Sequence, residues 1–191
     1  MKIILGSESV GRQRVLERAG YTFEMMPARI DEKAIRNSNP SALTLALALA
    51  KRDALLPRIT EPAILITSDQ VVVYAGNVRE KPTSQDEAFS FLGTLHLTSS
   101  ETVTSVVVTR TAPFKSMSAT DIARIYFRKI PEVVVREYIR AGNPYLNAGG
   151  FDCEHPLIAP YVNRLEGEKE SLLGLPLALT KQMIEGLSCE K

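Results

Sequence analysis

The stretch ILITSDQVVV, residues 64–73, sets an acidic side chain between two apolar runs, and the interpretation of the chain starts from it. The flanking residues, 63–67 and 71–74, have the β-branched and apolar composition of buried strands. A carboxylate between core strands is unfavourable unless a metal ion or a cation compensates its charge. We therefore predict that Ser68-Asp69-Gln70 interrupts the strand and places Asp69 at a strand end beside a ligand site. A plain turn or capping role for Asp69 is the alternative.

Outward from this stretch, β-type segments alternate with helical ones. Further strands are predicted at residues 2–5, 21–27, 102–109 and 119–127, the last two antiparallel. Helices are predicted at residues 10–19, 43–56, 84–92, 131–141 and 175–186, and a hairpin turn at Ala75-Gly76-Asn77. Strands interleaved with helices, together with an antiparallel pair, predict an α/β fold with a mixed sheet flanked by helices.

The composition excludes several classes of protein. Of the 191 residues, 45% are hydrophobic, and 23 basic against 22 acidic side chains give a net charge of +1. The apolar runs are too short to cross a bilayer, and residues 1–6 do not resemble a signal peptide. Cys153 and Cys189 cannot build a disulfide framework or a four-ligand zinc site. Because no Lys/Arg run marks a nucleic-acid surface, we expect one cytoplasmic domain over residues 1–191 with neither a nucleic-acid nor a membrane partner.

A small-residue loop near the N-terminus is suited to phosphate. Gly6-Ser7-Glu8-Ser9 precedes a helix that carries Arg12. Free backbone N–H groups at the helix start, the hydroxyls of Ser7 and Ser9, and the guanidinium could together cradle a phosphate. The alternative is that Ser9 only caps the helix.

Carboxylates and lysines supply a second kind of chemistry. Glu32, next to Asp31, could hold Mg²⁺ through oxygen ligands or form part of an ordinary acidic surface pair. Lys51, late in an apolar helix, could reach a phosphate or extend to solvent. Lys81 precedes Pro82, which restricts its backbone and so fixes the direction of its ammonium group. Each of these signals is weak alone.

Taken together, the segments resemble the Maf family of nucleotide pyrophosphatases over nearly the whole chain. The motifs that carry the resemblance are Leu5-Gly6-Ser7-Glu8-Ser9 with Arg12 and Leu16, Asp31-Glu32, Ala50-Lys51, Ser68-Asp69-Gln70-Val71-Val72, Glu80-Lys81-Pro82, Phe127-Arg128, Ala148-Gly149-Gly150-Phe151 and Gly174-Leu175-Pro176. Motifs in this order and near this spacing are hard to obtain by chance.

The resemblance implies an elongated α/β body with the active cleft between two lobes, similar to the inosine triphosphate pyrophosphatases. It implies hydrolysis of nucleoside triphosphates to monophosphate and pyrophosphate with Mg²⁺ or Mn²⁺. Asp69 resembles the general base, and Glu32 resembles its partner in binding metal or water. The residues that resemble the triphosphate clamp are Lys51 and Lys81 with Ser7 and Arg12, and Ser9 is a further expected substrate-binding residue. The oligomeric state is left open, a homodimer included.

Gln70 and Glu154 bear on the choice of base. Ser-Asp-Gln together with a Glu after the glycine–aromatic loop resembles the subgroup associated with 7-methylguanosine triphosphate, whereas the other subgroup prefers thymidine and uridine triphosphates. A carboxylate at Glu154 could accept from guanine N1–H and the exocyclic amine, and it would attract an N7-methylated ring. We therefore favour the methylated purine, as a substrate of a house-cleaning enzyme.

Members of the family usually show Ser-x-Ser-Pro-Arg-Arg, and here Val10-Gly11-Arg12 keeps only the second arginine. Arg14 is a candidate replacement for the missing phosphate contact. This loss motivates an alternative function, a catalytically weak nucleotide-binding regulator of cell division or growth. Residues 93–101 also form a longer segment than the corresponding loop of the family.

Overall fold

The computed structural model describes residues 1–188, which divide into two compact units. Unit 1 comprises Met1–Gln70, Thr104–Asp121 and Glu168–Lys191, the last of these described as far as residue 188. Unit 2 comprises Val71–Val103 and Ile122–Gly167. No described helix has the length and apolar character needed to cross a membrane.

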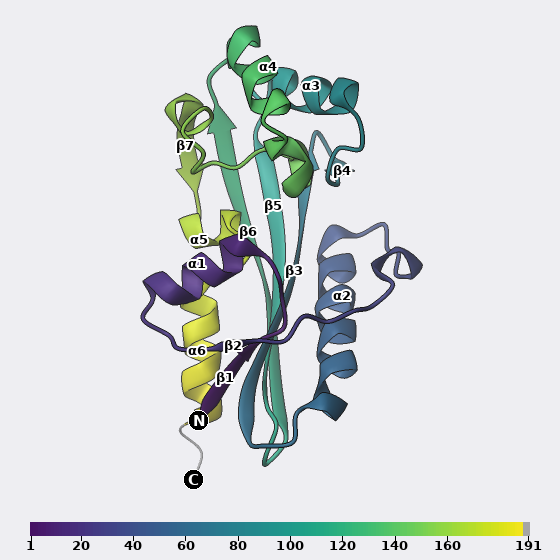
Figure 1. The fold of residues 1–191 in the computed structure, drawn as a ribbon, viewed down its shortest axis with the longest axis vertical. Helices are drawn as coiled ribbons and strands as arrows, with labels where there is room; N and C mark the ends of the chain where they lie inside the picture. Colours follow the sequence, from purple (N-terminus) through teal and green to yellow (C-terminus); the bar gives the residue numbers. More distant parts are fainter. Residues whose placement is uncertain (189–191) are drawn as a thin grey trace. The chain divides into compact units, whose positions relative to one another are not determined.

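The secondary structure is mixed (Figure 1). The strands are β1 (Lys2–Leu5), β2 (Glu24–Met25), β3 (Ala63–Tyr74), β4 (Asn77–Arg79), β5 (Ser100–Arg110), β6 (Lys115–Phe127) and β7 (Val162–Glu166). The α-helices are α1 (Val10–Arg18), α2 (Pro40–Leu55), α3 (Gln85–Thr94), α4 (Glu132–Arg140), α5 (Lys169–Leu172) and α6 (Leu177–Ser188). Short 3₁₀ helices are η1 (Glu32–Ala34), η2 (Leu56–Arg58), η3 (Asn143–Leu146), η4 (Ala148–Gly150) and η5 (Ala159–Tyr161).

The strands form one seven-stranded sheet in the order β2-β1-β3-β5-β6-β7, with β4 paired to β3. β1 is parallel to both β2 and β3, whereas the β3–β4 and β6–β7 pairs are antiparallel. β5 and β6 are neighbours joined by residues 111–114 only, a connection too short for anything but an antiparallel hairpin. The predicted α/β fold with a mixed, helix-flanked sheet is therefore confirmed.

In unit 1 both faces of the sheet are covered because successive strand residues point to opposite sides. Ile64 and Ile66 belong to a buried cluster with residues of α1 and α6, whereas Ala63 and Leu65 pack in a second cluster with Leu55 of α2. Figure 1 shows this arrangement, with α1 and α6 on one side of the unit 1 strands and α2 on the other. The same alternation continues along β3, so that Asp69 points to the α2 face whereas Ser68 and Gln70 point to the opposite face.

In unit 2, α3 packs against α4 and η4, and α4 packs against η3. The buried hydroxyl of Tyr138 accepts a hydrogen bond from the Asp152 backbone N–H at 3.0 Å, and the tyrosine ring meets His155 edge to face. Phe127 and Phe151 make a second edge-to-face pair, with ring centroids 5.1 Å apart. These contacts hold the glycine–aromatic loop against α4 and β6.

Two expectations from the sequence need correction, and two elements were not predicted. Residues 68–70 do not interrupt the strand, because β3 runs without a break from Ala63 to Tyr74. The strand expected at 21–27 is only Glu24–Met25, and β7 and α5 were not predicted. Residues 95–99 connect α3, which ends at Thr94, to β5, which begins at Ser100, and the greater length of this segment relative to the family stays a prediction.

Candidate functional site

Asp69, Lys51 and Glu32 form one charged cluster in unit 1. The Lys51 ammonium lies 2.6 Å from Asp69 Oδ1 and 2.8 Å from Glu32 Oε1. Lys51 and Asp69 are each only 7% exposed, whereas the Glu32 side chain, on the loop at η1, is half exposed. A single buried cation therefore joins two of the carboxylates that the sequence analysis selected.

The sequence builds this cluster through the pairing of α2 with β3. Asn39 caps α2 by accepting from the Ala42 N–H at 3.0 Å, and Pro40 occupies the first turn. One turn before the lysine, the Ala48 carbonyl accepts from Thr67 Oγ1 at 2.8 Å, which fixes the helix against the strand. Since Thr67 and Asp69 are two residues apart, both point to the α2 face, where Lys51 meets Asp69.

Burial sets the electrostatics of the cluster. Desolvation raises the pKa of Asp69 above its ordinary value of 3.8, and the charges of Lys51 and Arg12 oppose that rise. Burial also lowers the pKa of the Arg12 guanidinium, which the Asp69 and Glu32 carboxylates partly offset. A carboxyl with a raised pKa is a stronger base when it is ionised, so Asp69 is a stronger base than an ordinary aspartate.

Arg12 and Ser7 form a second cluster in the same unit. Arg12 is 9% exposed, and its Nη1 donates to Ser7 Oγ at 3.0 Å while its Nε donates to the Gly174 carbonyl at 2.9 Å. Ser7 Oγ also accepts from the Ser9 N–H at 3.1 Å. Ser9 occupies the N-cap position of α1, but its side chain makes no capping hydrogen bond, and its contact with phosphate stays a prediction.

Gln70 and Ser68 point away from Asp69, to the opposite face of β3. Gln70 Nε2 donates to Thr104 Oγ1 at 2.8 Å and to the Ser171 carbonyl at 2.5 Å. Ser68 Oγ donates to the Gly174 carbonyl at 2.9 Å. The amide group of Gln70 is thus engaged within unit 1, and its contact with a base stays a prediction.

Lys81 and Glu154 belong to unit 2. Lys81 is exposed, and the carbonyl of the preceding Glu80 accepts from the Gly149 N–H at 3.1 Å. Gly149 has a φ of +70°, and a Cβ there would lie 2.8 Å from Val72 Cγ1, so only glycine fits. The glycine loop and the Lys81 segment therefore contact each other within unit 2. The expected cleft between lobes stays a prediction, as does the expectation that Lys81 and Glu154 act at the same site as Asp69.

The residues present fit a divalent cation of the kind that shares its ligands with a nucleotide. Among the described residues no three histidine, cysteine, aspartate or glutamate side chains converge as a closed metal site. Glu32 and Asp69 nevertheless face the same ammonium. Mg²⁺ in nucleotide sites commonly takes one or two carboxylates and completes its shell with phosphate oxygens and water.

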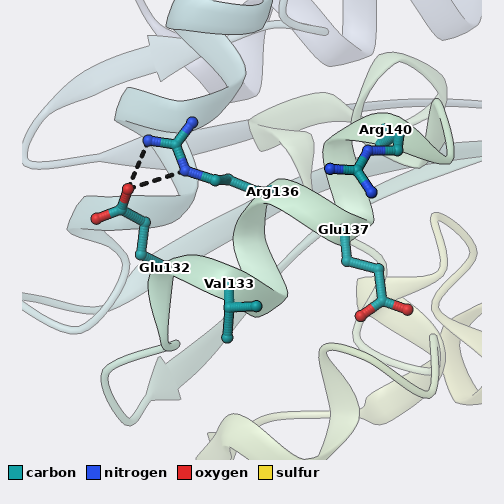
Figure 2. A pocket seen from close by; sticks show the side chains of 5 residues that line it. All are labelled: Glu132, Val133, Arg136, Glu137 and Arg140. Carbon is teal, nitrogen blue, oxygen red and sulfur yellow. Dashed lines mark hydrogen bonds and ion pairs between the residues drawn. The ribbon is translucent and has the colours of Figure 1, made fainter.

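A hollow on α4 carries no comparable chemistry. Figure 2 shows its lining, which comes from this one helix: Glu132, Val133, Arg136, Glu137 and Arg140. Arg136 is paired with Glu132 one turn away and lies over the Phe89 ring. These are features of a solvated amphipathic helix face.

Sequence reasoning missed the role of the turn at residues 171–174. Ser68, Gln70 and Arg12 all donate to its carbonyl groups. The period of two along β3 was the signal available, because it separates Ser68 and Gln70 from Asp69. The partner segment, about a hundred residues away, carried no motif beyond Gly174-Leu175-Pro176.

The fold and the site define a mixed α/β protein in which a buried carboxylate–lysine pair lies in the same unit as an arginine–serine cradle. The chain belongs to the Maf family, since the family model described as Maf-like protein matches residues 2–187. A 7-methyl-GTP pyrophosphatase from Dictyostelium discoideum is 42% identical over 193 residues, 97% of each chain. A dTTP/UTP pyrophosphatase from Pelotomaculum thermopropionicum is 32% identical, over 96% of this chain and 95% of its own.

Among solved structures, a nucleoside-triphosphatase described as a dITP/XTP pyrophosphatase, from Mycobacterium abscessus, matches 69% of this chain and 75% of its own. Its TM-score is 0.36 at 14% identity, which is too low to support an argument.

Proposed function

We propose that this protein hydrolyses nucleoside triphosphates to nucleoside monophosphate and pyrophosphate. The observation that carries the proposal is the contact of one buried ammonium, that of Lys51, with both Asp69 and Glu32. Family membership supports it, because relatives of this chain are named as pyrophosphatases of 7-methyl-GTP, of dTTP and UTP, and of nucleoside triphosphates.

In the proposed reaction a water oxygen forms a bond to the α-phosphorus, and the bond from that phosphorus to the bridging oxygen breaks. Pyrophosphate leaves with the bonding electrons, and the water proton passes to Asp69. Such a displacement depends on positioning and charge neutralisation more than on covalent catalysis. Lys51 orients the Asp69 carboxylate, while Arg12 and Ser7 bind phosphate oxygens, and Lys81 joins them as part of the clamp.

Glu32 and Asp69 are the proposed ligands of Mg²⁺, or of Mn²⁺ in its place. When bound, the ion would neutralise charge on the phosphate oxygens. The Lys51 ammonium supplies the positive charge that keeps the two carboxylates close to each other. With Glu32 and Asp69 holding the ion, the Lys51 ammonium could pair with a triphosphate oxygen, so that no buried charge would lack a partner.

We propose 7-methylguanosine triphosphate as the favoured substrate, with dTTP and UTP as the competitors, and a house-cleaning role. The relative at 42% identity is named for 7-methyl-GTP, whereas the relatives named for dTTP and UTP are 28% to 32% identical. Glu154 is the proposed base-reading carboxylate. We also propose that residues 1–191 form a single domain that acts in the cytoplasm. It would need neither a nucleic-acid nor a membrane partner, and a homodimer is a candidate assembly.

The test is release of pyrophosphate from a panel of canonical and modified triphosphates with Mg²⁺, read through added inorganic pyrophosphatase. Comparison of 7-methyl-GTP, dTTP and UTP in wild type and Glu154→Gln addresses the base. A folded protein that releases no pyrophosphate from any member of the panel would exclude the enzyme. Thermal stabilisation by nucleotide without product would then favour the regulator.

A further inference from the structure

The turn at residues 171–174 is fastened to β3 by the two side chains that flank Asp69. Ser68 Oγ donates to the Gly174 carbonyl at 2.9 Å, and Gln70 Nε2 donates to the Ser171 carbonyl at 2.5 Å. The Ser171 carbonyl also accepts from Thr104 Oγ1 at 3.3 Å. The turn is therefore bonded at both ends to the strand that carries Asp69, on the face opposite to the carboxylate.

The same turn holds Arg12. The Gly174 carbonyl accepts from Arg12 Nε at 2.9 Å as well as from Ser68, which a carbonyl with two lone pairs allows. With Nη1 engaged by Ser7, the guanidinium plane is fixed, and Nη2 alone of its nitrogens has no hydrogen bond to the described residues. The direction in which Nη2 points thus depends on the position of the Gly174 carbonyl.

Two glycines bring the turn and α1 into direct contact. A Cβ at Gly11 would lie 2.5 Å from the Leu173 carbonyl oxygen, and a Cβ at Gly174 would lie 3.2 Å from Arg12 Nε. Gly174 also has a φ of +92°, which other residues rarely adopt. Figure 1 shows α5, which overlaps the start of the turn, on the same side of the strands as α1. Close contact with α1 on one side and hydrogen bonds to β3 on the other therefore hold the turn in place.

We propose that Ser68 and Gln70 are positioning residues, which act through the 171–174 turn to aim the Arg12 guanidinium at the triphosphate. The inference rests on the proposed function, because it concerns how Arg12 meets the substrate. It assigns to Gln70 a role other than reading the base. Because the turn contacts both Arg12 and β3, the orientation of the Arg12 guanidinium depends on the strand that carries Asp69.

The first test is a double-mutant cycle between Ser68→Ala and Arg12→Ala, with the affinity for inorganic tripolyphosphate measured by calorimetry. Ser68→Ala should weaken binding about fivefold when Arg12 is present and less than about twofold when it is absent, because the hydroxyl acts only through the arginine. Ser105→Ala is the matched control, since Ser105 Oγ is buried and bonds Thr44 and Thr120 at 2.7 Å. Equal weakening in both backgrounds, or none in either, would overturn the inference.

The second test distinguishes positioning from base reading. Gln70→Met removes the amide donor while keeping the length of the side chain. It should raise KM for 7-methyl-GTP, dTTP and UTP by the same factor, about threefold to tenfold, with kcat nearly unchanged. A change confined to one base would assign Gln70 to the base and overturn the inference. If Ser68→Ala does not fold, this variant alone decides the question.

The two proposals fail separately. Wild-type protein that binds tripolyphosphate but hydrolyses no nucleotide would refute the proposed function, and the binding cycle would still decide the role of Ser68. With no nucleotide turned over, the Gln70→Met test would use the affinities for the three nucleotides in place of KM. Wild-type protein that does not bind tripolyphosphate would overturn the positioning role, because Arg12 would then have no phosphate to meet.

Discussion

Lys51 on α2 donates a 2.6 Å hydrogen bond to Asp69 on β3, and burial raises the pKa of that carboxyl despite the bond. The lysine therefore offsets only part of the desolvation that the aspartate suffers. A general base needs raised basicity and a fixed direction: burial supplies the first, and the contact with Lys51 supplies the second while limiting the rise of the pKa.

Replacing Asp69 by asparagine is the direct test of the proposed base. Asp69→Asn keeps an oxygen that can accept from Lys51 but removes the site that takes the proton. Turnover should fall by about 10³-fold, as is typical when a general base is lost, while affinity for tripolyphosphate changes little. Steady-state kinetics and calorimetric titration with tripolyphosphate measure the two effects.

Asp53→Asn is the control for that experiment. Asp53 is an exposed acid on the same helix as Lys51, and it pairs with Arg52 at 2.7 Å. Its loss should leave both turnover and binding as in wild type. Full activity in Asp69→Asn would exclude the proposed role of Asp69, and equal losses in the two variants would point to an effect of net charge.

Replacing Lys51 by methionine should make stability depend more strongly on pH than it does in wild type. A carboxyl whose folded pKa lies above its unfolded value favours the fold at low pH and loses that contribution as pH rises through the folded pKa. Because Lys51 lowers the pKa of Asp69, its removal raises this pKa further and leaves a buried charge uncompensated at high pH. The loss should reach about 3 kcal/mol at pH 8 and be smaller at pH 5.

Urea unfolding at the two pH values measures this loss. Adding Asp69→Asn to Lys51→Met should recover most of it, since the double variant has no buried carboxylate at this position. An equal loss at pH 5 and pH 8, unchanged in the double variant, would mean that Lys51 stabilises the fold through packing instead of charge.

The sequence was informative about β3 and α2 because both have strong patterns. The apolar runs of residues 63–67 and 71–74, and the apolar periodicity of residues 43–56, predicted the elements that carry Asp69 and Lys51. The predicted interruption at Ser68-Asp69-Gln70 was wrong for a physical reason. It treated the carboxylate as uncompensated, whereas Lys51 supplies the cation and lets the strand continue.

The remaining errors concern tertiary contacts that no local pattern encodes. β7 is a five-residue strand and α5 a four-residue helix, and neither is long enough to show a period. The partners of Ser68 and Gln70 lie 106 and 101 residues further along the chain. Only the alternation along β3 indicated that these side chains turn away from Asp69, and it could not name what they meet.

Glu32 should control how much metal the enzyme needs. Glu32→Gln removes one of the two proposed ligands but keeps a group of the same size, so the Mg²⁺ concentration at half-maximal rate should rise by about tenfold or more. Chelation of the metal should abolish turnover in wild type and variant alike. Glu61→Gln, an exposed acid outside the cluster, is the control. An unchanged Mg²⁺ requirement in Glu32→Gln would exclude Glu32 as a ligand.

The glycine at position 174 gives a last prediction, which separates strain from position. Gly174→Ala forces a side chain into a left-handed backbone and puts its Cβ 3.2 Å from Arg12 Nε, whereas Gly20→Ala meets the same backbone penalty, at φ +80°, in open space. Both should lose about 1 kcal/mol of unfolding free energy from the backbone. Gly174→Ala alone should also weaken tripolyphosphate binding, because its methyl group displaces the guanidinium. Calorimetry and urea unfolding on the two variants measure this difference, and equal binding by both would show that Arg12 tolerates movement of the turn.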